Sequence, residues 1–294
     1  MRAAAPTAPV APAAADEPFG VAQVMARAFG TALRRPFSLW LPTLLPFPAS
    51  LGAFIAIFTQ STNGRDEIVT FLAIGIAALV GLGGAGIAMG AVARITHTRI
   101  AGGRDTALAA YRAALLSPVS CALPVIAVVG AGFVMLYALS EGLGAIIGLF
   151  GVLVLCLVLV GLILLTLMAR LMPVLPAVVI ERKGLRGILR GVALGKGHAM
   201  GLGVVAAAMT LIAVGLGIVL GGLAGLAIDL LDPLMLDLPT YERDIVTTVY
   251  ASLVGGLSTA PPMVLLGTGM GAAYARLREI KEGALDDTVA EVFS

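Results

Sequence analysis

VTFLAIGIAALVGLGGAGIAMGAVA, residues 69–93, is an uncharged stretch that decides how this chain folds. Within it, Gly81, Gly83 and Gly86 match the G-x-G-x-x-G pattern of dinucleotide-binding turns. That pattern predicts nucleotide binding only between a strand and a helix, with an acidic residue about 20 positions later. Position 106 is a threonine, and the run reaches the length of about 20 apolar residues that crosses a bilayer. We therefore predict a membrane span here, without a nucleotide or other cofactor.

The composition of the whole chain also indicates a membrane protein. Apolar residues make up 59% of the 294 residues, charged residues only 12%, and the mean hydropathy is +1.03. Soluble domains carry about 25% charged residues. We therefore predict an all-α polytopic membrane protein whose charges are confined to short connections. Nothing in the composition predicts a nucleic-acid partner.

The chain contains six segments that are long and apolar enough to span a membrane. Only Ser140, Glu141 and Gly142 separate the third segment from the fourth, which predicts a tight helical hairpin. The six predicted spans are Leu39–Phe58, Ile68–Ala93, Val119–Leu139, Leu143–Ala169, Gly201–Ala227 and Ile245–Tyr274.

The basic residues predict the orientation of these spans. Of the 19 Lys and Arg residues, 17 fall in alternate connections, and only Arg65 and Arg243 fall in the others. Positively charged connections stay on the cytoplasmic side. This predicts a bacterial cytoplasmic (inner) membrane protein with both termini in the cytoplasm. Residues 1–18, rich in Ala and Pro and without a signal-peptide core, are expected to be a disordered cytoplasmic tail, and residues 19–294 the six-helix domain.

A unit of one amphipathic helix and one helical hairpin is repeated three times. The amphipathic helices lie near residues 27, 105 and 184, and apolar residues recur in each at helical spacing. The second is expected to open on Asp105 as its N-cap. A fourth short amphipathic helix is predicted to begin in EGALDDTVAEVF, residues 282–293, with no hairpin after it.

Basic residues on or beside these helices have two interpretations. In the simpler one, the helices lie in the headgroup layer and anchor the protein. In the other, they recognise anionic phospholipid heads, at about 1 kcal/mol for each basic group. The candidate contacts are Arg34, Arg35, Arg112, Arg182, Lys183, Arg186, Arg190 and Lys196.

The sixth predicted span contains a possible break. Ser258 and Thr259 precede the adjacent prolines Pro261 and Pro262, and two prolines remove two backbone donors from a helix. The freed carbonyl groups need partners in lipid. The break predicts either a solute site or gate at these four residues, or a packing kink satisfied by hydroxyl groups.

Glycines and the scarce metal-ligand residues have structural interpretations. Small-xxx-small faces are predicted at Gly86 and Gly90, at Gly267 and Gly271, and along Gly217, Gly221 and Gly225, where helix backbones would approach closely. His97 and His198 are assigned to cytoplasmic loops as interfacial residues, and Cys121 and Cys156 to packing. No metal site is predicted, because a zinc site needs about three clustered ligands.

Three stretches resemble a known family. They are FGVAQVMARAFGTALRRPFSLWL from Phe19, VVIERKGLRGILRGVALGKGHAMGLG from Val178 and AYARLREIKEGALDDTVAEVF from Ala273. They are similar to the membrane-domain family named after glycerophosphodiester phosphodiesterases and to its stand-alone bacterial relatives. Relatives tend to have a serine where Gly191 stands and a threonine where Gly195 stands. The resemblance implies the six-helix architecture; the stand-alone relatives mostly have no assigned activity.

The sequence favours a non-enzymatic function. It offers no nucleophile–base pair and no metal cluster, and it lacks the His-Arg-Gly motif of phosphodiesterase catalysis. We expect a protein that organises or handles lipids, or membrane-protein partners, through its basic helices. The alternative is a transporter or channel for a small or amphiphilic solute at the sixth span.

Overall fold

The computed structural model describes residues 19–34, 36–44, 67–127, 130, 166–182, 184–231 and 240–283. Within these residues the chain is helical and contains no strand, which confirms the all-α class. A helix without its own label covers Pro118–Ala127. The labelled helices are α1 (Val21–Arg34), α2 (Pro36–Leu44), α4 (Glu67–Ile100), α5 (Ala107–Leu115), α8 (Val174–Glu181), α9 (Leu185–Gly195), α10 (Ala199–Leu231) and α11 (Thr240–Glu282).

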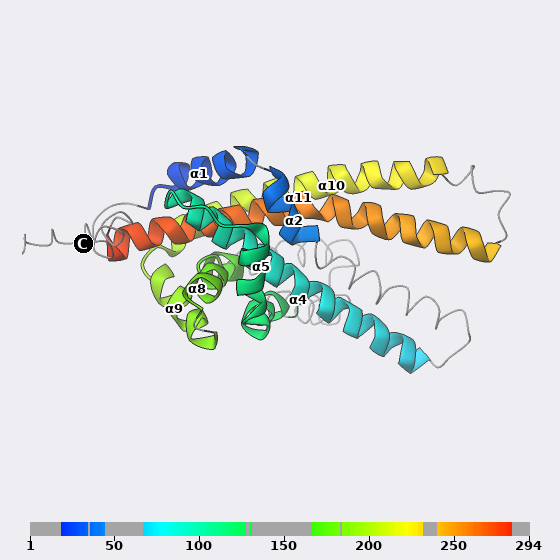
Figure 1. Ribbon diagram of the computed structural model, residues 1–294, viewed down its shortest axis with the longest axis horizontal. Coiled ribbons are helices and arrows are strands. Elements are labelled where there is room, and N and C mark those ends of the chain that lie inside the picture. The colour runs from blue at the N-terminus through cyan, green and yellow to red at the C-terminus, as the bar shows by residue number, and fades with distance from the viewer. Residues whose placement is uncertain are drawn as a thin grey trace, which may run out of the picture.

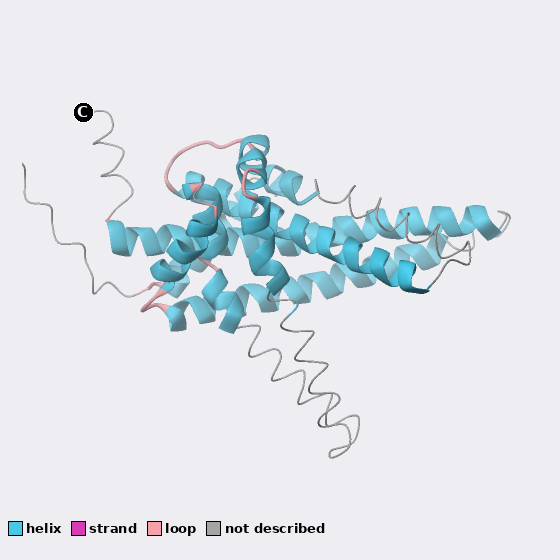
Figure 2. Cartoon of the chain, turned by 90° about the horizontal axis from the view of Figure 1, so that it is seen from below, coloured by secondary structure: helices cyan, strands magenta, loops and turns pink. Residues whose placement is uncertain are grey.

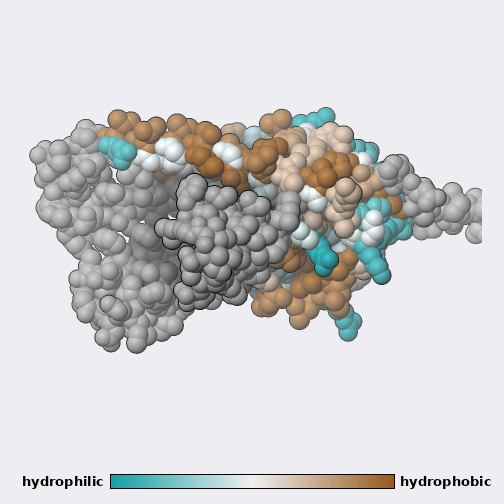
Figure 3. All heavy atoms as spheres, turned by 180° about the vertical axis from the view of Figure 1, so that it is seen from behind, coloured by the Kyte–Doolittle hydropathy of each residue, from teal (hydrophilic) through white to brown (hydrophobic). Residues whose placement is uncertain are grey.

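The long helices α4, α10 and α11 form an elongated part of the molecule, which we call the shaft (Figure 1). α11 packs along α10 and along α4. The short helices α1, α5, α8 and α9 surround the opposite part, the short-helix end, where the described loops also gather (Figure 2). Most hydrophilic side chains on the face in Figure 3 lie at this end, whereas apolar side chains cover the visible shaft.

One described helix is by itself long and apolar enough to cross a bilayer: Ala199–Ala227 within α10. A second candidate is the pair Ala107–Leu115 and Pro118–Ala127, which is bent by 80°. The predicted second and sixth spans lie within α4 and α11. The fifth predicted span lies within α10, whereas the first, third and fourth extend partly or almost wholly outside the described residues. The six-span arrangement therefore stays a prediction.

Glycines bring α4 and α11 into close contact, as two of the predicted small-xxx-small faces require. A Cβ added to Gly271 would lie 2.5 Å from the Ala93 carbonyl oxygen, and one added to Gly267 would lie 2.8 Å from Val92 Cβ. On α4, a Cβ at Gly90 would come within 2.8 Å of Val179 on α8. In the GLGGAG segment, a Cβ on Gly86 would collide with the Cys121 carbonyl oxygen. Only glycine allows these approaches, so the end of this segment belongs to a packing surface.

The third predicted glycine face has few contacts among the described residues, so most of it stays a prediction. Gly217 makes an ordinary contact, since its added Cβ would lie 3.7 Å from Pro262 Cγ. Added Cβ atoms at Gly221 and Gly225 would meet no atom of the described residues within 4 Å. The spacing predicts a small face correctly, but it does not determine whether another helix lies on that face.

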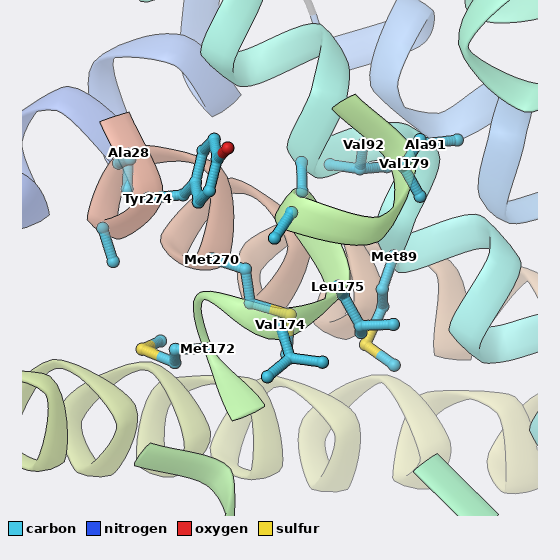
Figure 4. Close-up of a cluster of buried hydrophobic side chains, with 14 of the residues drawn as sticks. Ala28, Met89, Ala91, Val92, Met172, Val174, Leu175, Val179, Met270 and Tyr274 are labelled. Atoms are coloured by element: carbon cyan, nitrogen blue, oxygen red, sulfur yellow. The ribbon is translucent and has the colours of Figure 1, made fainter. Parts of the chain in front are cut away.

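The buried core lies where α4, α8 and α11 meet. Figure 4 shows Met89, Val92, Leu175, Val179 and Met270 converging from these helices. Leu175 and Met270 are almost completely buried, and Val179 is fully buried. Burying each such side chain contributes about 1.5–3 kcal/mol, so this cluster fixes the short-helix end.

The three predicted amphipathic helices are confirmed as α1, α5 and α9. The N-cap of α5 differs from the prediction: Thr106, rather than Asp105, accepts a hydrogen bond from the Ala109 N–H at 3.2 Å. Asp105 instead pairs with Arg94 at 2.7 Å, which joins the loop to the end of α4. The predicted tail, residues 1–18, and nearly all of the predicted terminal helix lie outside the described residues.

Candidate functional site

The basic helix α9 is held against α8 by two glycines. A Cβ on Gly187 would lie 2.8 Å from Val178 Cα, and one on Gly191 would lie 2.5 Å from Val174 Cα. Backbone therefore packs on backbone at both positions. A serine in place of Gly191 would not fit this contact without a shift of the helices.

This packing turns the apolar side chains of α9 outward. Leu189 is 74% exposed, and Leu185 and Val192 are exposed as well. Ile188 packs against the core instead. The amphipathic pattern thus marks a face that points away from the protein, next to the exposed Arg186. A helix with such a face and basic neighbours is typical of a membrane interface.

The connection from α8 to α9 has an unusual backbone. Arg182, the C-cap of α8, adopts the left-handed conformation with φ 52°, which non-glycine residues rarely do. Gly184, the N-cap of α9, has φ 53°, and no side chain caps the helix. The reversal leaves the side chain of Arg182 exposed beside the beginning of α9.

A polar cluster joins α8 and α9 to the end of α11. We call it the α11 cluster and define it as Glu181, Arg190, Tyr274, Arg278 and Glu282. The hydroxyl of the buried Tyr274 donates to Glu181 Oε1 at 2.8 Å, and Arg190 Nε lies 3.4 Å from the same oxygen. Arg190 also pairs with Glu282, which accepts from Arg278 Nε at 2.7 Å. Two sequence stretches that carry the family resemblance thus meet in one network.

Lys281 links α11 to the other end of α9. Its Nζ donates to the carbonyl groups of Ala193 and Lys196, each at 3.0 Å. These carbonyl groups lie at the C-terminus of α9, where the helix has unpaired acceptors and a partial negative charge. The ammonium group therefore satisfies that terminus and holds α9 parallel to the protein surface.

Ion pairs also attach α1 to this end of α11. Arg27 on α1 pairs with Glu279, and Arg276 Nη1 lies 3.2 Å from the other oxygen of the same carboxylate. The buried side of α1, Val24 and Ala28, belongs to the core cluster. The amphipathic helices α1 and α9 are thus both fixed to the last turns of α11.

The structure separates the predicted lipid contacts into two groups. Arg190 is engaged in the α11 cluster. Among the described residues, the other candidates form no ion pair and are exposed; they are Arg34, Arg112, Arg182, Arg186 and Lys196. Arg35 and Lys183 lie outside the described residues. An exposed, unpaired guanidinium group is available to an external anion, so this second group is the candidate functional site.

α1, α2 and α5 expose apolar side chains in the same way as α9. Leu33 and Phe37, at the junction of α1 and α2, are largely exposed, and so are Leu108 and Leu115 on α5. Arg34 and Arg112 stand beside them. Each amphipathic helix therefore combines outward apolar residues with an unpaired cation.

His97 is placed differently from the prediction. It lies in α4 rather than in a loop, and it is buried, with its ring 5.5 Å from that of Tyr274. Its Nε2 has no hydrogen-bond partner. Burial, with the nearby Arg278 and Arg94, lowers the pKa of His97 to about 4. The side chain is therefore neutral at pH 7, and it contributes to packing. His198 is half-buried in the turn before α10, against Phe19.

The predicted break at Pro261 and Pro262 was wrong, because α11 continues as one helix from Thr240 to Glu282. Packing of α11 against α4 and α10 supports the helix through the two missing donors. Thr268, a neighbouring hydroxyl, is buried and donates to Leu265 O at 2.9 Å within the same helix. Ser258 is half-buried and Thr259 exposed. The kinked solute site therefore loses the observation that suggested it.

Sequence reasoning did not find the contact between Glu181 and Tyr274 or the cap formed by Lys281. The available signal was that all three residues flank predicted spans on the same, basic side. Among the described residues, no group of three or more His, Cys, Asp and Glu side chains could hold a metal ion. No protein-family model matches the chain, and searches of curated proteins and solved structures found no match.

Proposed function

We propose that this chain is a six-span protein of a bacterial cytoplasmic membrane that organises or handles anionic lipids through α1, α5 and α9, without catalysis. The shaft would lie in the hydrocarbon, and the short-helix end would lie at the cytoplasmic surface. The observation that carries the lipid role is the geometry of α9. Its glycine face packs on α8, so Leu185, Leu189 and Arg186 are presented outward together.

The exposed side chains of α10 support a membrane location. Ile218 is 70% exposed and Leu211 75%, and other apolar residues of this helix are exposed beside them. Water makes such a continuous apolar surface unfavourable, at about 25 cal/mol for each Å². Hydrocarbon removes this cost. Only 28% of the most apolar part of α10 is buried, unlike the core helix of a soluble protein.

The lengths of the other shaft helices agree with the same location. At about 1.5 Å per residue, the 34 residues of α4 extend about 50 Å and the 43 residues of α11 about 65 Å. The hydrocarbon core is about 30 Å thick. Both helices can therefore span it and continue into the short-helix end, where the basic last turns of α4 and α11 lie.

We also propose that the chain is related to the membrane-domain family named above. The contact between Tyr274 and Glu181 gives a physical role to two stretches that carry the resemblance. A transporter or channel is the weaker alternative function, because α11 is uninterrupted and provides no broken helix for a solute site.

Lipid analysis tests the proposed function. The full chain is purified from its own membranes in a mild detergent, and the lipids that accompany it are quantified by mass spectrometry. We expect anionic phospholipids to be enriched over the bulk membrane, and the enrichment to fall in the Arg182→Gln/Arg186→Gln variant. An Arg104→Gln/Arg170→Gln variant removes the same charge from exposed positions outside the amphipathic helices and serves as the control.

Two outcomes would contradict this proposal. Bulk lipid alone, accompanied by one recurring partner protein, would indicate a scaffold. Equal losses in the two variants would show that α9 has no special role.

A further inference from the structure

The N-terminus of α9 lies beside the N-terminus of the helix Pro118–Ala127. Ser120 lies in the first turn of the helix Pro118–Ala127, and its Oγ is 3.9 Å from the position that a Cβ on Gly184 would occupy. Gly184 is the N-cap of α9. A helix N-terminus carries a partial positive charge of about one half, so two of them in contact repel each other unless an anion lies nearby.

The backbone of both helices leaves donors at this junction. The first hydrogen bond of α9 runs from the Gly187 N–H to Gly184 O, at 2.9 Å. The N–H groups of Leu185 and Arg186 precede it and have no acceptor within the helix. In the helix Pro118–Ala127, the first hydrogen bond runs from the Cys121 N–H to Ser117 O, at 3.0 Å. The Ser120 N–H precedes this bond and likewise has no acceptor within its helix. No side chain caps α9.

The Ser120 side chain is the second observation that points to a ligand. Ser120 is only 5% exposed, and within the described residues its hydroxyl makes no hydrogen bond. Serine in a first helical turn usually satisfies its hydroxyl locally, through a hydrogen bond to the nearby backbone. Its Oγ faces the N-cap of α9 instead, where an acceptor would complete it.

The charges around the junction favour an anion. Arg182 and Arg186 flank Gly184 in the chain and are exposed, and within the described residues neither forms an ion pair. The nearest acid along the chain, Glu181, is engaged by Tyr274 and Arg190. Helix N-termini with arginine guanidinium groups are a common arrangement for binding phosphate.

We propose that a phosphate group binds at this junction, between Ser120 Oγ, the first N–H groups of α9 and the guanidinium groups of Arg182 and Arg186. The phosphate would be that of an anionic lipid head, because the exposed Leu185 and Leu189 place α9 at the bilayer surface. The inference rests on the proposed function and deepens it, since it replaces a diffuse attraction with one saturable site.

The test measures how tightly soluble probes bind to the full chain in a nonionic detergent, by native mass spectrometry. The probes are dihexanoyl phosphatidylglycerol, dihexanoyl phosphatidylcholine and inorganic phosphate. We expect one molecule of the phosphatidylglycerol to bind saturably and more tightly than the phosphatidylcholine. Ser120→Ala should raise its Kd about fivefold, the effect of one lost hydrogen bond, with an unchanged melting temperature. Arg182→Gln/Arg186→Gln should raise it more than tenfold.

Competition separates the two sources of phosphate. If inorganic phosphate displaces the short-chain lipid, the phosphate group alone is sufficient for the site; if it does not, the site requires the lipid. Either result agrees with the site, provided that Ser120→Ala weakens binding.

The inference would be overturned if Ser120→Ala bound the lipid as tightly as the wild type. If Arg182→Gln/Arg186→Gln and the control Arg104→Gln/Arg170→Gln then weakened lipid binding equally, the attraction would come from diffuse positive charge. The proposed association with anionic lipid would remain, without this site. No binding of phosphatidylglycerol to the wild type would overturn the site, and absence of anionic lipid in the purified protein would overturn the proposed function as well.

Discussion

The two ends of this molecule obtain their stability in different ways. At the short-helix end, glycines bring helix backbones together, and ion pairs connect α1, α9 and α11. Along the outer part of α10, leucines and isoleucines are exposed, and a Cβ added to Gly221 or Gly225 would meet no atom of the described residues within 4 Å. The first region is complete within the chain, whereas the second requires a surrounding apolar medium. A sequence rich in glycine and leucine throughout therefore contains two physically distinct regions.

The largest expected effect comes from overpacking the glycine contacts of the first region. Gly271→Leu would force a side chain against the Ala93 carbonyl group, and we expect a loss of about 3 kcal/mol or more in the free energy of unfolding. Gly221→Leu, in open space on α10, is the matched control and should change it by less than about 0.5 kcal/mol. Thermal unfolding in detergent measures both. Equal losses would remove the distinction between the two regions.

A pH dependence of similar size is expected from His97, which lies beyond the predicted span 68–93. Its pKa is about 4 in the folded protein, against an ordinary value of 6.5. The unfolded chain therefore takes up the proton first as the pH falls. Stability is complete above pH 6.5, falls as the pH drops from 6.5 to 4, and levels off below 4, for a total loss of about 3 kcal/mol.

Melting temperatures of the wild type and His97→Gln between pH 7 and pH 4 measure this effect. We expect the variant to lose most of the slope. His198→Gln is the control, because His198 is only half-buried and should contribute less. A wild-type slope that persists in His97→Gln would show that other groups cause it.

A smaller effect is expected at the α11 cluster. Tyr274→Phe removes the hydroxyl that donates to Glu181 and should reduce stability by about 2 kcal/mol, as for other hydrogen bonds to a charged group. Tyr111→Phe is the control: Tyr111 is half-buried, and its hydroxyl makes no hydrogen bond within the described residues. The free energy of unfolding is measured in detergent. If it were the same for both variants, the hydrogen bond from Tyr274 would add no stability.

The smallest expected effect is at the start of α5. Thr106→Ala should cost about 1 kcal/mol, because it removes the side chain that caps the helix. Asp105→Ala tests the prediction that Asp105 is the N-cap. Its effect on stability should come from the lost ion pair with Arg94. Adding Arg94→Ala to each variant distinguishes loss of the helix cap from loss of the ion pair. The stability lost through Arg94→Ala should add to the loss from Thr106→Ala, but not to the loss from Asp105→Ala.

The sequence predicted what depends on periodicity. Apolar spacing located α1, α5 and α9, and glycine spacing located the contacts at Gly86, Gly90, Gly267 and Gly271. These features depend on residues close together in the chain, so a short window contains the information.

What it did not predict depends on partners far away in the chain. The spacing of Leu185 and Leu189 marks a face but does not say whether that face points inward, and the close approach of Gly191 to Val174 decided this. Tyr274 and Glu181 are 93 positions apart, and no local pattern joins them. Pro261 and Pro262 were expected to break a helix that packing on two sides keeps continuous.

The accessibility of spin labels in the reconstituted protein tests whether the shaft lies in hydrocarbon. Single labels are placed at Ile218→Cys on α10 and at Ala109→Cys on α5, in a Cys121→Ala/Cys156→Ala background. If the shaft lies in hydrocarbon and the short-helix end at the surface, the label at 218 collides far more often with oxygen than with a water-soluble nickel complex. The label at 109 then has a much higher ratio of nickel-complex collisions to oxygen collisions than the label at 218. A label at 218 that collides freely with the nickel complex would show that α10 faces water, and the account would be wrong.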